Sequence, residues 1–103
     1  MFHSDNYTEE GDTKNNSLIK TDEIQSFSYC LGEVLRDIRK QKINATQGEL
    51  GLRLGLTQKA ISDAESGRTV ASVYLFCKYC EEANIEPHDA IRKLDEAWKD
   101  RKF

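Results

Sequence analysis

The sequence predicts an all-α fold of about five short helices, from apolar spacing and from helix start and stop signals. In several segments apolar residues recur three and four positions apart, which places them on one face of a helix. Thr46, Thr57 and Ser72 each stand directly before such a segment, where a side-chain oxygen can cap the first turn. Gly55 and Gly67 each follow one, where a left-handed residue ends a helix at little steric cost. A chain of 103 residues suits a single small domain.

The first helix of this domain is expected to begin near Ser26. Residues 1–25 are polar and have no apolar period, so we expect them to form a disordered acidic leader. The leader is either a solvated tail or an arm that binds a partner protein, and the sequence leaves both open. The apolar face of the helix that follows comprises Phe27, Leu31, Val34, Leu35 and Ile38.

Residues 46–67 predict two short helices joined by a tight turn. Thr46 and Glu49 have the spacing of a capping box, which starts the first of them. The second, from Gln58 to about Ser66, turns Ile61 inward. Two helices joined by a short Gly-containing turn form a helix-turn-helix motif, whose second helix can enter the DNA major groove.

The same stretch resembles the phage-repressor and Cro-like (XRE-type) helix-turn-helix family. The resemblance implies a compact, five-helix, lambda-repressor-like DNA-binding domain over residues 26–94, with residues 95–103 as a C-terminal helix extension. The linker before Thr46 is one residue longer than is common in this family, and Asn44 can supply its left-handed residue. The residues that carry the resemblance are Thr46, Gln47, Leu50, Leu54, Gly55, Thr57, Gln58, Ile61, Ser62, Glu65, Gly67 and Arg68.

The exposed face of the second helix is expected to contact DNA bases through Gln58, Lys59, Ser62 and Asp63. A glutamine can pair with adenine, a lysine can donate to guanine, and an aspartate can accept from cytosine N4. The resemblance implies base reading by Gln58, Lys59 and Asp63, and a phosphate or methyl contact by Thr57. The alternative is a polar, solvated face.

The resemblance also implies roles for five residues around this helix. Gln47 contacts a phosphate and braces the recognition helix, unless it is simply a polar residue in a helix start. Arg68 and Thr69 touch the DNA backbone, although Arg68 could instead extend into solvent. Arg39 pairs with Glu65, and this pair connects the first helix of the domain to the recognition helix.

A fourth helix is expected after Ser72, with Val73, Phe76, Cys80 and Ala83 turned inward. Cys77 and Cys80 are spaced as in some zinc and redox sites, but a helix without further regular ligands favours two core cysteines. We therefore expect no metal and no cofactor.

A fifth helix is expected to start at Pro87, which is tolerated in a first turn. Its apolar stripe is longer than a compact domain needs, so Ile91, Leu94 and Trp98 are expected to form a dimer interface. For Trp98, packing on the protein's own core is the alternative.

Charge and cysteine content limit the classes of function. The net charge of −3 resides in residues 1–29, which carry −4, whereas residues 30–94 carry +1. The three cysteines form no paired framework, and no segment is apolar enough for a membrane helix or a secretory signal, so we expect a cytoplasmic protein. No catalytic constellation stands out, and we do not expect an enzyme.

The sequence therefore favours a sequence-specific, DNA-binding transcriptional regulator, a repressor that binds a two-fold-related operator as a homodimer. One short helix reads few base pairs, so doubling the site multiplies discrimination. Two alternatives stay open: an antitoxin that neutralises a partner protein through its leader or C-terminal helix, and an adaptor that binds only proteins.

Overall fold

The computed structural model describes residues 10–102, with the backbone alone for residues 10–21 and Lys102. Within this range the chain forms five α-helices and one π-helical turn, and no strand, so the predicted all-α class is confirmed. The elements are α1 (Glu10–Ile38), η2 (Arg39–Ile43), α2 (Gln47–Leu54), α3 (Gln58–Ser66), α4 (Val73–Ala83) and α5 (Pro87–Lys102).

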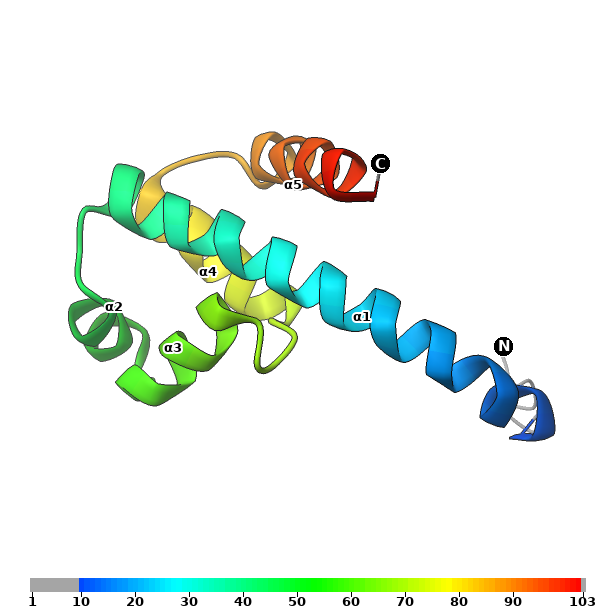
Figure 1. The fold of residues 1–103 in the computed structure, drawn as a ribbon. Coiled ribbons are helices and arrows are strands. Elements are labelled where there is room, and N and C mark those ends of the chain that lie inside the picture. The colour runs from blue at the N-terminus through cyan, green and yellow to red at the C-terminus, as the bar shows by residue number, and fades with distance from the viewer. Residues whose placement is uncertain (1–9, 103) are drawn as a thin grey trace, which may run out of the picture.

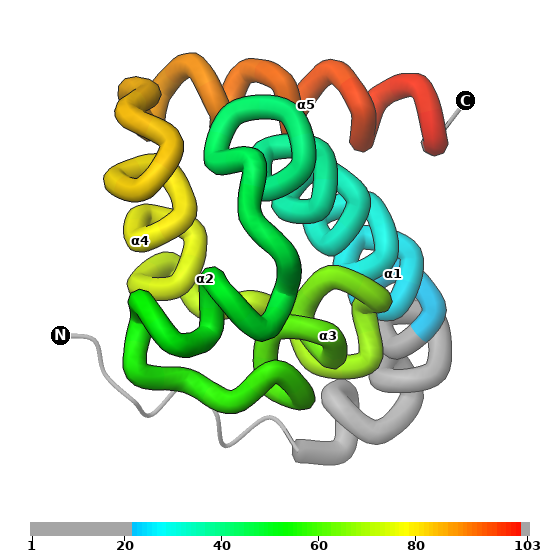
Figure 2. Tube along the Cα trace, turned by 90° about the vertical axis from the view of Figure 1, so that its left-hand side faces the viewer, coloured from blue at the N-terminus to red at the C-terminus, as the bar shows by residue number. Residues whose placement is uncertain are grey.

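The helix α1 is the axis around which the other helices pack. In Figure 1, α2 and α3 lie below its C-terminal half, α5 lies above it and α4 passes behind it. Seen along α1 in Figure 2, the other four helices surround a shared interior. The buried apolar residues of this core are Cys30, Leu31, Val34, Leu35, Ile38, Leu50, Ile61, Ala64, Phe76, Tyr79, Cys80, Ala90 and Leu94.

The start of α1 corrects a prediction, because the helix begins at Glu10 rather than near Ser26. Residues 10–25, assigned to the leader from the sequence, therefore continue the helix. Extending an existing helix adds one hydrogen bond per ordered residue and avoids the cost of a new nucleus, so a polar segment can be helical without an apolar period. Residues 1–9, the rest of the predicted leader and partner-binding arm, lie outside the described residues.

Each predicted N-cap residue caps the first turn of its helix as expected. The hydroxyl of Thr46 accepts from the Glu49 amide at 3.0 Å, and the Glu49 carboxylate accepts from the Thr46 amide at 2.9 Å, which completes the capping box. Thr57 caps α3 and Ser72 caps α4 in the same way, each through the amide three residues on.

The first linker contains a π-helical turn that takes up its extra residue. The amide of Asn44 donates to the carbonyl of Arg39, five residues back, at 2.7 Å. A five-residue interval holds one residue more than an α-helical turn does, so α2 can start in place despite the longer linker. Asn44 then adopts the predicted left-handed conformation, with φ of 59°.

The middle of α1 lies directly against the C-terminal end of α3. A Cβ atom at Gly32 would clash with the backbone carbonyls of Ala64 and Glu65, so only a glycine permits this approach. The hydroxyl of Ser28 donates to the carbonyl of Gly67 at 2.9 Å, and the Gln25 amide donates to it at 3.2 Å. These bonds satisfy a carbonyl that the end of α3 would otherwise leave without a partner.

The inward face of α4 differs from the prediction at its first residue. Val73 is 79% exposed, whereas Tyr79, which is not among the predicted inward residues, is fully buried. Val73 lies in the first turn, beyond the edge of the core. The buried stripe instead follows the spacing of Phe76, Tyr79 and Cys80.

The three residues of the predicted dimer interface on α5 differ in how far the fold buries them. Leu94 is 8% exposed and belongs to the core, so it is not available for contact with a second copy. Trp98 is half-buried and meets the ring of Phe27 edge-on, with ring centroids 5.3 Å apart. Ile91 alone of the three stays well exposed, at 50%.

The close approach at Gly32 yields a stability prediction. Gly32→Ala should lower the free energy of unfolding by about 2 kcal/mol, because the new methyl meets backbone atoms that cannot rotate away. Urea unfolding followed by circular dichroism measures the change. Gly48→Ala is the matched control, because a Cβ there meets nothing closer than 3.7 Å and alanine favours the helix. An unchanged stability in Gly32→Ala would contradict this packing.

Candidate nucleic-acid interface

A rigid turn sets the angle between α2 and α3. Gly55 ends α2 with φ of 72°, and the amide of Leu56 returns to the carbonyl of Gly51 at 2.8 Å. At Gly51 a Cβ would lie 2.8 Å from the carbonyl oxygen of Leu56, so the turn folds tightly onto α2. Thr57 then starts α3 at once, and the two helices act as one unit.

Glu65, near the end of α3, is the centre of a buried hydrogen-bond network. Its Oε2 accepts from Arg39 Nε at 2.8 Å and from the Tyr79 hydroxyl at 2.7 Å. Its Oε1 accepts from Arg39 Nη2 at 2.9 Å and from Gln47 Nε2 at 3.0 Å. The remaining guanidinium nitrogen, Arg39 Nη1, donates to the carbonyl of Ala45 at 2.9 Å. The pair of Arg39 and Glu65 implied by the family resemblance is thus bidentate.

We call Arg39, Glu65, Tyr79 and Gln47 the buried network, and it joins four elements at one point. These residues come from η2, α3, α4 and the start of α2, so the orientation of α3 is fixed from three sides. Burial acts to raise the pKa of Glu65, but the hydrogen bonds from Arg39, Tyr79 and Gln47 outweigh it and bring the pKa below the ordinary 4.5. Desolvation and the bond to Glu65 raise the pKa of Tyr79 well above its usual range, so its hydroxyl stays a donor.

Tyr79 is the member of this network that sequence reasoning missed. Its position three residues after Phe76 and one before Cys80 is the available signal, since it completes the buried stripe of α4. That its hydroxyl meets a carboxylate could not be read from the spacing, because Glu65 is brought there by the packing of a different helix.

The outer side of α3 carries the four residues expected to contact bases. We call Gln58, Lys59, Ser62 and Asp63 the recognition face. Gln58 and Lys59 are exposed, while Ser62 and Asp63 are partly covered. Gln58 and Lys59 stand in the first turn of α3, so both side chains lie at its free N-terminal end.

Asp63 lies between two cations. Its Oδ2 accepts from Lys59 Nζ at 3.0 Å, and its Oδ1 accepts from Arg68 Nε at 2.9 Å. The bonds from Arg68 and then from Lys59 lower the pKa of the Asp63 carboxyl, so it is charged at neutral pH. The contact from Arg68, which lies beyond the end of α3, was not foreseen from the sequence.

The residues expected to touch the DNA backbone flank this face. Thr57 precedes α3 and Thr69 follows it, and both are exposed. The amide of Thr69 donates to the carbonyl of Asp63 at 3.2 Å, which fixes the loop after α3 against the helix. Gln47 is partly covered through its bond to Glu65. Seven of the eight predicted contact residues thus lie on α3 or within three residues of its ends, and Gln47, at the start of α2, meets α3 through its bond to Glu65.

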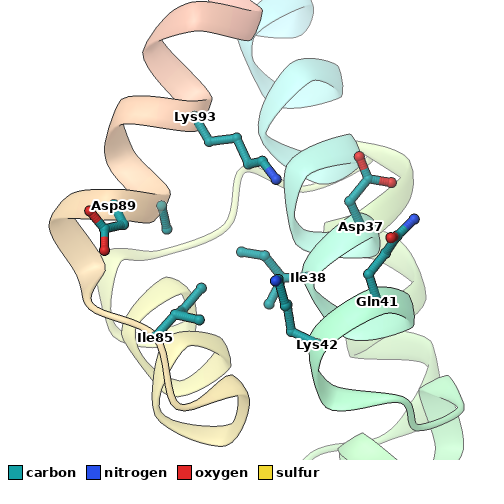
Figure 3. Close-up of a pocket in the computed structure, with 8 residues that line it drawn as sticks. Asp37, Ile38, Gln41, Lys42, Ile85, Asp89 and Lys93 are labelled. Atoms are coloured by element: carbon teal, nitrogen blue, oxygen red, sulfur yellow. The ribbon is translucent and has the colours of Figure 1, made fainter.

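A cleft of about 540 Å³ opens on another part of the molecule, between the end of α1 with η2 and the start of α5. Figure 3 shows the amines of Lys42 and Lys93 directed into it from opposite walls, with Ile38 reaching in from α1 and Ile85 from the segment before α5. Asp37 and Asp89 stand at its rim, so the charges of the lining residues balance.

The cysteines lie in the core or at its edge: Cys30 and Cys80 are buried, and Cys77 is partly exposed. Burial raises the pKa of the Cys30 and Cys80 thiols, and the three cysteines are free. No group of three potential metal ligands lies together between residues 22 and 101. Among the described helices, none combines the length and the apolar character needed to cross a bilayer.

A fixed α2–turn–α3 unit with a polar face on its second helix defines the chain as a helix-turn-helix protein. The helix-turn-helix family matches residues 35–89, more than half of the 103-residue chain. The chain belongs to this family, in its XRE type, which is a family of DNA-binding regulators. Searches of curated proteins and of solved structures gave no match.

The buried network predicts a specific loss of stability in acid. Because the pKa of Glu65 is lower in the folded than in the unfolded protein, the unfolded state binds the proton first, and this part of the stability is lost as pH falls below about 4.5. Glu65→Gln should cost about 3 kcal/mol at pH 7, because it leaves Arg39 buried without its charged partner. The difference in free energy of unfolding between wild type and Glu65→Gln should become smaller as pH falls. Urea unfolding between pH 3 and pH 7 measures it.

The control for the acid experiment is Glu82→Gln. Glu82 forms a partly exposed pair with Arg53 at 3.5 Å, so its loss should cost less than about 1 kcal/mol. A Glu65→Gln deficit that stays constant down to pH 3 would show that the carboxylate of Glu65 is not stabilised by the network.

Proposed function

We propose that this protein is a sequence-specific transcriptional repressor that binds a two-fold-related operator as a homodimer. The observation that carries the proposal is the recognition face: an exposed polar surface on a helix whose buried side is fixed by the Glu65 network. A rigid helix supports base reading because hydrogen bonds to base edges require side chains held in place before contact. Repression follows if the bound protein occupies a promoter.

Four side chains of α3 would read the major groove. Gln58 is exposed at the N-terminal end and can pair bidentately with an adenine. Lys59 can donate to guanine O6 and N7, Asp63 can accept from cytosine N4, and Ser62 can serve either kind of base edge. Resemblance to phage repressors supports the same positions.

Backbone contacts would come from the residues that border α3. The hydroxyls of Thr57 and Thr69 and the guanidinium of Arg68 can bind phosphates, which positions the protein without reading sequence. Gln47 gives one N–H of its amide to Glu65 and keeps a second, which can reach a phosphate. A phosphate bound there would be linked through one side chain to the buried network.

The near-neutral charge of residues 30–94 fits a protein that depends on base contacts more than on phosphate attraction. Non-specific binding comes almost entirely from phosphate neutralisation, so a small positive charge makes it weak. Binding as a dimer compensates for this weak phosphate attraction, because two linked half-sites multiply the affinity for the correct sequence. For the dimer contact, α5 offers the exposed Ile91 beside the half-buried Trp98.

Selection of bound duplexes from a random pool tests this function directly. At about 50–100 mM salt, a range in which phosphate contacts remain effective, wild type should enrich a two-fold-symmetric site. Gln58→Ala and Lys59→Ala should each lose preference at one position per half-site, by about 1–3 kcal/mol. Lys93→Ala is the control, since it removes a cation from α5, on a different face of the fold.

Two results would refute the proposal. Enrichment that Gln58→Ala and Lys59→Ala leave unchanged would remove α3 as the recognition helix. A wild-type protein that enriches no duplex would favour the protein-binding alternatives, an antitoxin or an adaptor, over a repressor.

The dimer contact has its own test. Ile91→Asp should shift sedimentation equilibrium toward the monomer and weaken binding to the two-fold site, because a charge would be buried at the contact. Val73→Asp is the matched control, since Val73 is more exposed than Ile91 but lies on α4. Equal behaviour of both variants and wild type would exclude Ile91 from the interface.

A further inference from the structure

Lys59 and Asp63 form one donor–acceptor unit on the recognition face. Lys59 Nζ and Asp63 Oδ2 lie 3.0 Å apart, one helical turn from each other on α3. The side chain of Lys59 is 81% exposed and that of Asp63 is 17% exposed, so the carboxylate is the less accessible of the two charged groups. A lysine and an aspartate at this distance present a positive donor directly beside a negative acceptor.

Arg68 holds this unit in place from the other side. Its Nε donates to Asp63 Oδ1 at 2.9 Å, so each carboxylate oxygen already has one partner. A carboxylate has about four acceptor sites and an ammonium has three donors. Both charged groups therefore keep hydrogen-bonding capacity after pairing with each other, and the pair need not separate to meet DNA.

The major-groove edge of a G·C pair has a complementary arrangement. Guanine presents two acceptors, N7 and O6, and cytosine presents the N4 amino donor beside them. Because N4 and O6 are hydrogen-bonded to each other within the pair, they lie roughly 3 Å apart, the usual length of such a bond. This separation matches the distance between Lys59 Nζ and Asp63 Oδ2.

An A·T pair matches the unit less well. It presents its amino donor between two acceptors, with the thymine methyl at the far side. If Asp63 accepts from this amino group, Lys59 can reach only one acceptor beside it, whereas a G·C pair offers Lys59 two. An aspartate facing phosphates or an acceptor is repelled, so a sequence without the amino group at this place is penalised.

We propose that Lys59 and Asp63, positioned by Arg68, read a single G·C pair in each half-site, with guanine on the Lys59 side. Asp63 thereby determines specificity in two ways: it accepts from cytosine N4 at the correct site, and it weakens binding everywhere else. Before DNA is bound, the carboxylate of Asp63 also offsets the positive charges of Lys59 and Arg68. This inference rests on the proposed DNA-binding function and names the base pair that the unit recognises.

The test uses the site selected by wild type and three duplexes that differ at the position under Lys59 and Asp63. One duplex keeps G·C, the second inverts it to C·G, and the third carries A·T. Wild type should bind the inverted and A·T duplexes about 5- to 150-fold more weakly than the G·C duplex, the range for one mismatched pair. Inversion preserves the composition of the DNA, so the loss reports orientation.

Asp63→Ala, which removes the acceptor oxygens altogether, should abolish most of this discrimination, leaving less than about a threefold preference, whereas a good base contact gives far more. Its binding to a random-sequence duplex should tighten, with a salt dependence steeper by about one charge per protomer. The double variant Lys59→Met/Asp63→Ala should discriminate no worse than Asp63→Ala alone, because the two residues act as a unit.

Asp95→Ala is the matched control. Asp95 accepts from Lys99 Nζ at 3.1 Å, one turn away on α5, so this variant makes the same charge change in the same kind of ion pair. It should keep the full preference for G·C. Surface pairs of this type contribute little stability, so both aspartate variants should fold, which circular dichroism verifies.

Three outcomes would overturn the inference. In the first, wild type enriches a two-fold site that has no fixed G·C pair contacted by α3. In the second, Asp63→Ala keeps the preference, which would show that Asp63 does not contact the base pair and that its ion pairs are structural only. Either leaves the repressor function intact. A wild type that enriches no site at all would overturn the proposed function and this inference together.

Discussion

The ion pair between Arg39 and Glu65 is the interaction on which the arrangement of the helices depends. Both charges are buried, at 6% and 4% exposure, and each is stabilised because the other is present. Glu65 has four bonds within 3.0 Å, so its carboxylate is satisfied without water. A buried charge with such a complete set of partners tolerates few alternative packings, which makes the orientation of α3 a property of four elements at once.

The buried side and the solvent-facing side of α3 differ in the kind of contact that they make. Inside, the contacts are fixed: Glu65 in its network, and Gly32 of α1 against the backbone at the helix end. Outside, Asp63 is held between two cations by hydrogen bonds near the surface. The same nine-residue helix therefore combines a buried side fixed by the network with a polar side whose charged groups are already paired.

Much of the fold could be predicted because local chemistry specifies the ends of the helices. Thr46, Thr57 and Ser72 cap their helices as their spacing indicates, and Asn44 takes the left-handed turn. The contacts across helices were harder to predict. Tyr79 reaches Glu65 only once α4 packs against α1 and η2, and Arg68 reaches Asp63 only after the left-handed Gly67 ends α3. The start of α1 was misplaced because helix propagation needs no apolar period.

The bonds from α1 to Gly67 bear on where the domain begins. The family match starts at residue 35, yet Gln25 and Ser28 already hold the loop after α3, and Leu31 and Val34 fill the core beneath it. A fragment cut at residue 35 would keep the helix-turn-helix motif and the buried network, but it would lose the bonds from α1 to Gly67 at the end of the second helix. The smallest portable module, for a fusion or a domain exchange, is therefore one that includes the chain from Gln25 onward.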